Sequence, residues 1–439
     1  MLPCVQTAIN RLEGAGYACH VVGGCVRDSL LGLTPHDWDL TTNALPECVA
    51  ELFSEFRVIP TGMKHGTVTV IIDDVPLEIT TYRVDGEYRD HRHPTGVCFV
   101  SDITEDLRRR DFTVNAMAWN PQSGLCDPFG GENDLKHNIL RCVGDAETRF
   151  EEDALRILRA LRFAATYGFT VEDATAKALF ACAPLLQSVA AERVQAELNR
   201  LLVAPHVGDV LRQFATVLYP VLPELQKTEG VLQYNPYHDK DVLGHTIASL
   251  EAAVPVLPVR LALLLHDCGK PEHFEWIREG FGHFPNHPEI GAEMAKEVLR
   301  RLRYDNRTVK TVCNLIRYHD SAIPETDAGV RRWIYHVGEQ TLRWLLDVKT
   351  GDCKGHAANI PPAREDEIRR LRARIDRVVA EGQCTSLSQL ALDGDRLLKE
   401  GFSGPEVGRI LQRALDAVID GECPNDTEAL LAVISQQKT

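Results

Sequence analysis

Residues 21–32 read VVGGCVRDSLLG, and the segment HDWDL follows at residues 36–40. The apolar residues before Gly23 are typical of a buried strand, and the residues after Gly24 are typical of a helix. Glycines at such a turn let backbone N–H groups approach a phosphate closely, and the N-terminus of a helix favours negative charge. We therefore expect a strand over residues 17–22 that ends in a phosphate-binding turn.

Two aspartates, Asp37 and Asp39, follow this turn. On a strand, residues i and i+2 point to the same face, so the two carboxylates would repel each other unless a cation lay between them. Mg²⁺ prefers oxygen ligands and often also contacts substrate phosphates, so the pair predicts a two-ion Mg²⁺ site for phosphoryl transfer. Glu78 in the apolar segment PLEITTYR is a candidate third catalytic carboxylate. The alternatives are a solvated turn for the aspartates and a solvent-facing edge strand for Glu78.

The segment DLRRRDFTVNAMAW at residues 106–119 contains three consecutive arginines. Arg108, Arg109 and Arg110 could supply positive charge for a triphosphate, and Asn115 could hold a ribose or phosphate oxygen. An arginine run by itself is more often a solvated basic surface. The nucleotide-binding interpretation therefore depends on the carboxylates that precede the run.

The spacing of apolar residues predicts strands in the first third of the chain and helices after about residue 146. The expected strands are 17–22, 38–40, 56–59, 67–72 and 77–82. The expected helices include 5–15, 153–167, 170–182, 190–202, 206–214 and 364–379. The predicted fold class is α+β, with a mixed sheet first and helices after it.

Composition limits the class of protein. Hydrophobic residues make up 44% and charged residues 25% of the 439 residues, as in ordinary soluble proteins. The net charge of −15 argues against a generally basic surface, although a local basic patch or metal ions can still bind nucleic acid. The thirteen cysteines include no C-x-x-C pair. With no signal peptide or membrane-spanning run, we expect a cytoplasmic protein with free thiols and no membrane partner.

Five motifs follow one another in the order seen in one known family. They are GGCVRDSLLG…DWD, RRDFTVNA, DPFGGENDL, EEDALRILRALRFA and ERVQAELNRLL, within residues 20–205. As a set they resemble the class II tRNA nucleotidyltransferases of the polymerase-β-like superfamily. That group contains CCA-adding enzymes, CC-adding and A-adding relatives, and bacterial poly(A) polymerases. The resemblance implies a nucleotidyltransferase head followed by an all-helical neck, body and tail.

The resemblance also implies roles for individual residues. Asp37 and Asp39 would hold the catalytic Mg²⁺ ions. Asp127, Gly130 and Asp134 match a segment that links head motion to the neck. Glu192 and Arg193 match a helix that supports the base-recognition motif, which contains Glu152. The implied nucleotide-binding residues are Gly23, Gly24, Arg27, Arg109, Arg110, Asp111, Asn115, Asp153, Arg156, Arg159 and Arg162.

Asp153 and Arg156 have a physical rationale as base-recognition residues, because three-residue spacing would place them on one helix face. Cytosine and adenine each present an exocyclic amine beside a ring acceptor, which suits a carboxylate and an arginine. Uracil and guanine would leave the carboxylate without a donor, and that loss is costly in a desolvated pocket. The alternative is an ordinary helical ion pair.

Residues 84–100, VDGEYRDHRHPTGVCFV, distinguish members of the family. They resemble the full-length flexible loop of enzymes that add the terminal A, whereas CC-adding relatives carry a shorter loop. The segment KHGTVTV at residues 64–70 lacks the paired basic residues typical of the poly(A) polymerases. We therefore expect addition of complete CCA to the 3′ end of tRNA from CTP and ATP, with A-only addition or poly(A) synthesis as alternatives.

The C-terminal half contains a second set of candidate ligands. Its order, H…HD…H…H…D, resembles the HD superfamily of metal-dependent phosphohydrolases. The residues are His245, His266, Asp267, His287, His319 and Asp352, with Asp320 as an alternative to His319. Imidazole and carboxylate ligands suit a divalent transition metal, and an open coordination position could activate water against a phosphate. The alternatives are structural histidines and an inactive scaffold.

The expected domains are a head at 1–143, a neck at 144–205, a body at 206–360 with the HD domain at about 240–355, and a helical tail at 361–439. The tail opens with AREDEIRRLRARIDR, which either contacts tRNA phosphates or carries internal ion pairs. Its arginines are Arg364, Arg369, Arg370, Arg372, Arg374 and Arg377. Two other functional classes remain possible at this point: an HD hydrolase with an inactive RNA-binding head, and a non-enzymatic tRNA scaffold.

Overall fold

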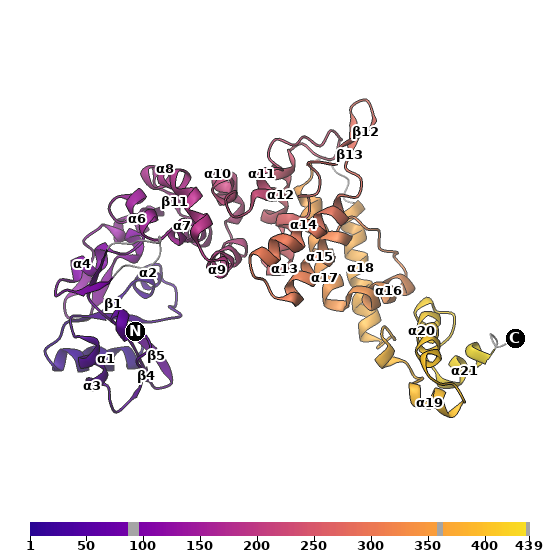
Figure 1. The fold of residues 1–439 in the computed structure, drawn as a ribbon, viewed down its shortest axis with the longest axis horizontal. Helices are drawn as coiled ribbons and strands as arrows, with labels where there is room; N and C mark the ends of the chain where they lie inside the picture. The colour runs from indigo at the N-terminus through magenta and orange to yellow at the C-terminus, as the bar shows by residue number, and fades with distance from the viewer. Residues whose placement is uncertain (87–95, 358–362, 436–439) are drawn as a thin grey trace. The chain divides into compact units, whose positions relative to one another are not determined.

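The computed structural model describes residues 1–86, 96–357 and 363–435. The chain divides into two compact units, Met1–Pro223 and Glu224–Thr439. The first unit combines a sheet with helices, and the described part of the second is almost entirely helical (Figure 1). This confirms the predicted α+β class. The finer boundaries at residues 143, 205 and 360 remain predictions.

The first unit is organised on a seven-stranded sheet with the strand order β3-β4-β5-β2-β1-β8-β9. Only the pairing of β2 with β5 is parallel, so the sheet is mixed. In β4 the apolar residues Val68, Val70 and Ile72 are buried and alternate with more exposed residues, as expected for a sheet with one covered face. The strands are β1 Cys19–Val22, β2 Asp39–Thr42, β3 Arg57–Ile59, β4 Thr67–Ile72, β5 Val75–Thr81, β8 Ala118–Asn120 and β9 Gly124–Cys126.

Short helices cover the apolar side of this sheet. Helix α1 (Pro3–Gly14) buries Val5, Ala8, Ile9 and Leu12, whose spacing places them on one helical face. Helix α3 (Pro46–Leu52) contacts both β4 and β5, while α2 (Gly24–Leu30) packs next to β1. The strand–turn–helix order expected around Gly23 and Gly24 is therefore present.

Two further strands, β6 (Arg83–Asp85) and β7 (Val97–Phe99), pair antiparallel with each other. They form the two ends of the segment at 84–100 that resembles the family's flexible loop. Residues 87–95, the centre of that segment, lie outside the described residues.

Helices and short turns carry the remaining motifs of the first unit. The 3₁₀ turn η2 (Thr113–Asn115) packs against α5 (Gly131–Lys136), and α7 (Leu155–Tyr167) packs against α9 (Ala191–Leu202). The other described elements are α4 Ile103–Arg108, β10 Ile139–Leu140, α6 Ala146–Glu152, β11 Thr170–Val171, α8 Asp173–Cys182 and α10 Val207–Phe214.

The prediction of a continuous helix over 153–167 was wrong at its start. Helix α6 ends at Glu152, and Asp153 has extended dihedrals, φ −139° and ψ 102°. Helix α7 begins only at Leu155, so Asp153 does not lie on the same helix as Arg156. The apolar spacing of α7 is visible in the sequence, but the extended residue before it is not.

In the second unit, several helices pack around α13 (Leu257–Leu265). This helix is buried on all sides, including Val259 and the run from Leu261 to Leu265, as a central helix requires. Its surroundings include α12 Val242–Ala252, α15 Asn306–Tyr318 and α17 Glu339–Gly355. Helix α14 (His287–Arg301) packs on α15, and the hairpin β12–β13 (Glu275–Arg278 and Phe281–His283) extends from this helical core in Figure 1.

The arginine-rich helix α18 (Ala363–Ala380) packs against α16 (Asp327–Val337) and α17, and its arginines form ion pairs within α18, with these two helices and with the segment before α16. The pairs are Arg364–Asp320, Arg369–Asp366, Arg370–Glu325, Arg372–Asp347, Arg374–Asp327 and Arg377–Asp327. The charges of these arginines are largely balanced by carboxylates of the same unit. This favours an ion-paired helix over a surface built to contact tRNA phosphates.

The tail after α18 has a small apolar core of its own. It is formed by α19 (Gly394–Lys399), α20 (Pro405–Asp420) and α21 (Thr427–Ser435), with Leu397, Leu415 and Leu430 fully buried. No helix among the described residues is long and apolar enough to cross a membrane. All thirteen cysteines are free thiols.

Gly131 is required for the contact between α5 and η2. A Cβ atom at this position would lie 2.2 Å from the backbone oxygen of Thr113 and 2.9 Å from Cγ of Met117. We expect Gly131→Ala to lower the free energy of unfolding by about 1–3 kcal/mol, because overpacking forces the backbone to shift. Chemical denaturation measures this change.

Gly14→Ala is the matched control, since nothing lies within 4 Å of a Cβ atom at this helical position. There the replacement should be neutral or stabilising by up to ~1 kcal/mol, because alanine favours helix. Equal stabilities for the two variants would show that α5 does not pack on η2 as described.

Candidate functional site

The three predicted catalytic carboxylates gather at adjacent strands of the first unit. Asp39 begins β2 and is the register partner of Glu78 on the neighbouring parallel strand β5. Paired residues on adjacent strands point to the same side of a sheet. Glu78 is exposed between the buried residues Leu77 and Ile79, on an internal strand rather than at an edge. Asp37 is exposed in the irregular segment before β2, so the expectation that both aspartates lie on the strand was wrong for Asp37.

The surroundings of Asp39 disfavour its negative charge. Burial raises its pKa, repulsion from Glu78 and Asp37 raises it further, and Arg110 acts in the opposite direction, which leaves a pKa of about 6. A divalent cation among these carboxylates would relieve both the burial and the repulsion. The residues therefore fit an Mg²⁺ site, although the number of ions remains a prediction.

The glycine turn after β1 lies directly beside Arg110. Gly23 has φ +79° and ψ −131°, and its N–H donates to the backbone oxygen of Met117 at 3.1 Å. A Cβ atom at Gly23 would lie 2.8 Å from Nη1 of Arg110. The positive φ favours glycine, and a Cβ atom at this position would force the Arg110 side chain to shift. The turn thus keeps the guanidinium close to Asp39.

A chain of hydrogen bonds runs from α2 to α7. The Asp111 carboxylate accepts from Nδ2 of Asn115 at 3.1 Å and from Nε of Arg159 at 2.8 Å. Burial would raise the pKa of Asp111, but the charges of Arg159 and Arg156 and the hydrogen bonds from Asn115 and Arg159 together outweigh it and lower that pKa to about 2. Oδ1 of Asn115 accepts from Nη1 of Arg27, which is itself paired with Asp28 at 2.8 Å.

The guanidinium of Arg27 lies over the ring of Tyr167, with 4.6 Å between its Cζ atom and the ring centroid, so this buried residue is committed to protein partners. Arg27 and Arg159 therefore hold Asn115 and Asp111 in position. Their direct contact with a nucleotide stays a prediction.

The two base-recognition candidates are held by different partners. Asp153 forms an ion pair with Arg193 of α9 at 3.0 Å. Arg156 is nearly buried, and it donates to Glu152 at 2.7 Å and to the backbone oxygen of Arg109 at 2.9 Å. Arg156 therefore links the base-recognition helix directly to the arginine run.

Arg162 and Glu197 form a further ion pair between α7 and α9, with 2.8 Å between Nε and Oε2. Burial lowers the pKa of Arg162 to about 10, against the attraction of Glu197. Glu197 is a buried carboxylate that was not singled out from the sequence. Its position four residues after Arg193 on the amphipathic helix α9 was the available signal.

Two predicted linking residues, Asp127 and Asp134, have structural partners around α5. Asp127 accepts from the backbone N–H groups of Gly131 and Glu132 at the start of this helix. Asp134 is buried and accepts from the hydroxyl of Thr113 at 2.7 Å. Gly130 precedes the helix with φ +76°. These contacts fix η2, which carries Asn115.

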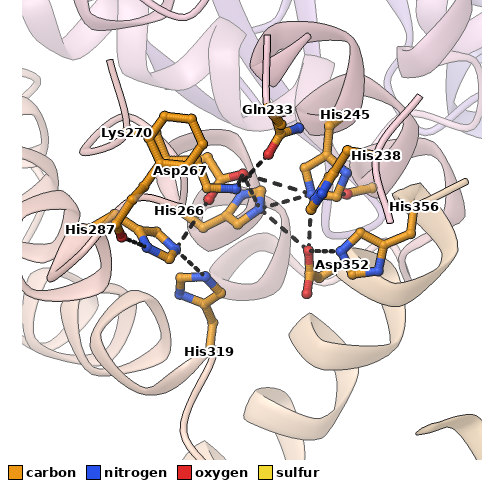
Figure 2. A network of polar contacts seen from close by, with 12 residues as sticks. Gln233, His238, His245, His266, Asp267, Lys270, His287, His319, Asp352 and His356 are labelled. Atoms are coloured by element: carbon orange, nitrogen blue, oxygen red, sulfur yellow. Dashed lines mark hydrogen bonds and ion pairs between the residues drawn. The ribbon is translucent and has the colours of Figure 1, made fainter. Parts of the chain in front are cut away.

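The six ligand candidates of the second unit lie together (Figure 2). His245 Nε2 is 2.9 Å from Oδ1 of Asp352, and His266 Nε2 is 3.3 Å from Oδ2 of Asp267. His287 Nε2 is 3.6 Å from Oδ1 of Asp267 and 3.4 Å from Nε2 of His319. His319 is buried in this cluster, whereas the Asp320 side chain is 60% exposed and pairs with Arg364.

Three of these histidines are oriented by the backbone. Nδ1 of His266, His287 and His319 lies 2.8, 2.8 and 2.6 Å from the carbonyl oxygens of Leu263, Phe284 and Ile316. A carbonyl oxygen can only accept, so Nδ1 carries the hydrogen and Nε2 presents its lone pair to the cluster. This is the usual orientation of histidines that bind metal ions. Burial also lowers the pKa of His319 to about 3, which keeps the ring neutral.

The cluster fits a divalent metal ion. Oδ1 of Asp267 and Nδ1 of His245 are buried without a hydrogen-bond partner, which is costly unless another group binds there. Asp267, His287, His319 and Asp352 line a cavity of about 300 Å³. Lys270 and Arg364 also line it and could neutralise a phosphate.

Three residues of this site were not predicted from the sequence: His238, Lys270 and His356. His356 follows Asp352 by four residues at the end of α17, so helical spacing could have revealed it. Lys270 follows Asp267 by three residues, and its Nζ is 2.7 Å from Oδ2 of that aspartate. His238 lies in a loop before α12, where no local pattern marks it.

Three family models match the chain. The poly A polymerase head domain matches residues 19–141, and tRNA nucleotidyltransferase domain 2 matches residues 286–434. A third model, described as "Probable RNA and SrmB- binding site of polymerase A", matches residues 168–228. These matches lie in both compact units.

Curated relatives align over nearly the whole chain. The CCA-adding enzyme of Streptococcus thermophilus (strain CNRZ 1066) is 31% identical over 437 residues, covering 98% of this chain and 96% of that protein. The CCA-adding enzyme of Geobacillus thermodenitrificans (strain NG80-2) is 32% identical over 442 residues, covering 100% and 98%.

Solved structures align over similar lengths. The Bacillus stearothermophilus CCA-adding enzyme in complex with CTP superposes with a TM-score of 0.74 at 28% identity, covering 100% of this chain and 98% of that one. The Thermotoga maritima CCA-adding enzyme complexed with tRNA shares the fold, with a TM-score of 0.61 at 20% identity over 99% and 94% of the two chains.

The charge of Asp39 should destabilise the protein in the absence of Mg²⁺. Its folded-state pKa of about 6 exceeds the ordinary 3.8, so the folded state favours the protonated form, and stability falls as the pH rises from 3.8 to about 6 and stays low at higher pH. Asp39→Asn should therefore raise the free energy of unfolding by about 1–3 kcal/mol at pH 8, and by less at pH 5. Denaturant titrations of the metal-free protein at both pH values measure this difference.

Glu51→Gln, on the exposed side of α3, removes a carboxylate of the same unit that is not in the cluster. This control should change stability little at either pH. A pH-independent effect of Asp39→Asn would contradict the proposed burial and repulsion at Asp39.

Proposed function

The chain belongs to the CCA-adding enzymes, a family of tRNA nucleotidyltransferases, and on this premise we propose that it adds or repairs the 3′-terminal CCA of tRNA from CTP and ATP without a nucleic-acid template. The observation that carries the proposal is the carboxylate group of Asp37, Asp39 and Glu78 beside Arg110 and the glycine turn. The tRNA 3′-hydroxyl attacks the α-phosphate of the nucleotide, a new phosphodiester bond forms, and pyrophosphate leaves.

Asp37 and Asp39 would hold two Mg²⁺ ions, with Glu78 completing the carboxylate group. When bound, Mg²⁺ lowers the pKa of the attacking hydroxyl and stabilises the negative charge of the leaving pyrophosphate. Arg110 provides positive charge next to these carboxylates, where the triphosphate would bind. Asn115 would hold a ribose or phosphate oxygen, and its orientation is set by Asp111 and Arg27.

Base selection would rest on Asp153 and Arg156. The Asp153 carboxylate can accept a hydrogen bond from the exocyclic amine of cytosine or adenine, and Arg156 can donate to the adjacent ring acceptor. Arg193 orients the first residue and Glu152 the second. Because Asp153 lies in the break between α6 and α7 and Arg156 lies in the first turn of α7, a small change at this break could alter their spacing.

Incorporation of labelled nucleotides tests this function. With Mg²⁺ and tRNA transcripts ending before CCA, after C and after CC, we expect two C additions and one A addition, followed by a stop. Asp39→Ala should reduce incorporation by ~10³-fold or more, because its metal ions supply several kcal/mol of transition-state stabilisation. The exposed variant Glu51→Gln should retain normal incorporation.

The alternatives give different products in the same assay. Addition of A alone to the CC-ended transcript would indicate an A-adding enzyme, and long A tails would indicate a poly(A) polymerase. Binding of tRNA without turnover would indicate a scaffold. Each of these outcomes would contradict the proposal.

A second activity is favoured by the histidine–aspartate cluster of the second unit. Its ligand atoms converge, three rings are oriented through Nδ1, and Lys270 and Arg364 line the same cavity. We propose a divalent-metal phosphohydrolase that acts on 2′,3′-cyclic phosphates or phosphomonoesters at RNA ends. Water would attack phosphorus, the phosphate ester P–O bond would break, and the released sugar hydroxyl would take up a proton.

Separate losses of the two activities test this assignment. Asp267→Asn should lower hydrolysis of a 2′,3′-cyclic nucleotide by more than about 100-fold in the presence of Mn²⁺ or Ni²⁺, since it removes a metal ligand. The same variant should retain CCA addition, and Asp39→Ala should show the reverse pattern. Hydrolysis that survives Asp267→Asn, or that disappears in Asp39→Ala, would contradict a separate hydrolytic centre.

A further inference from the structure

We propose that His238 and His356 form an additional divalent-metal position next to the histidine–aspartate cluster, completed by His245 or Asp352. This inference rests on the proposed metal centre and extends it by two ligands that the HD-type pattern did not contain. One ligand nitrogen from each of His238, His245 and His356 lies within 4.8 Å of the others. The position would take a transition-metal ion such as Zn²⁺, which imidazole ligands suit.

The tautomer of His238 is fixed by its loop. Its Nδ1 lies 2.7 Å from Oδ1 of Asn235, and the same oxygen accepts the backbone N–H of Tyr237 at 3.1 Å. Because a backbone N–H can only donate, that Asn235 atom is an oxygen acceptor, and Nδ1 of His238 must carry the hydrogen. Nε2 of His238 therefore keeps its lone pair, as in the three histidines oriented by backbone carbonyls.

His356 approaches the cluster from the end of α17. Its ring centroid is 4.5 Å from that of His238 and 5.1 Å from that of His245. Its Nε2 is 3.7 Å from Oδ1 of Asp352, while its Nδ1 is buried without a hydrogen-bond partner. A buried imidazole nitrogen without a hydrogen-bond partner is costly. A bound ion that draws the His356 ring toward His238 would allow this ring to rotate out of that position.

Shared carboxylates would connect the additional position to the HD-type ligands. Asp267 lies between the pair His245–His266 and the pair His287–His319. Asp352 lies on the other side, with Oδ1 2.9 Å from His245 and 3.7 Å from both His266 and His356. Figure 2 shows Asp352 between His245, His266 and His356. One carboxylate can thus serve the predicted HD-type ligands and the additional position, as bridging ligands do in multinuclear sites.

The additional position would also face the substrate. His238 and His356 line the same cavity of about 300 Å³ as Lys270 and Arg364. An ion at this position could bind an oxygen of a phosphate ester that enters the cavity. The additional position would therefore hold a divalent transition-metal ion. On the side that faces the cavity, this ion could bind a phosphate oxygen.

The number of Zn²⁺ ions bound by the full chain tests the inference. Equilibrium dialysis in excess Mg²⁺, which occupies the carboxylate site of the first unit, is followed by metal analysis. We expect His238→Ala and His356→Ala each to bind one Zn²⁺ fewer per chain than the parent, and the double variant to lose no more than one. His273→Ala, which removes an exposed histidine outside the cluster, should bind as the parent does.

Circular dichroism of the metal-free variants shows whether they are folded, and His238→Gln replaces His238→Ala if the latter is not. Folded variants that bind as many ions as the parent would overturn the inference and leave the HD-type centre intact. A parent that binds no Zn²⁺ would overturn both the proposed metal centre and this extension of it. The readout does not depend on hydrolytic activity.

Discussion

The repulsion between Asp39 and Glu78 is the constraint on which the catalytic end of the first unit depends. It arises from the parallel pairing of β2 with β5, which places the two carboxylates at the same register position. In the metal-free protein, a neutral residue in place of Asp39 would remove both the burial of this charge and the repulsion. The surrounding groups instead balance the charge only in part, through Arg110, which the glycine turn keeps close. The unfavourable charge of the metal-free site is therefore also what makes it attract a divalent cation.

The arginines of this unit divide into those that face this charge and those that support other side chains. Arg110 belongs to the first group, whereas Arg27 and Arg159 hold Asn115 and Asp111. Arg156 contacts the backbone of Arg109, so the base-recognition helix is connected directly to the arginine run. If Arg156 reads the base as proposed, a base that misplaces it would also disturb Arg109. The proposed base selection would then have a physical route to the proposed phosphate-binding residues.

Local sequence patterns predicted the features that depend on local spacing. The strand at 67–72, the glycine turn and the strand positions of Asp39 and Glu78 follow from alternation and from motif order, whereas the pairing of β2 with β5 came only from the structure. The break at Asp153 was missed because its extended conformation comes with a partner 40 residues away, Arg193. The partners of the α18 arginines, such as Glu325 and Asp347, come from distant segments as well. His238 was missed because it approaches the cluster from a loop, and only the tertiary fold brings it to His356.

The two candidate centres differ in the chemistry of their ligands, and this difference favours different metal ions at the two. The first offers carboxylate oxygens alone, which suits Mg²⁺, while the second offers mainly neutral imidazole nitrogens, which favour transition metals. All ligands of each centre come from a single compact unit of the chain. Neither centre borrows a ligand from the other, and each is oriented by hydrogen bonds within its own unit. The proposed synthesis and the proposed hydrolysis would therefore favour different ions, Mg²⁺ at the first centre and a transition metal at the second.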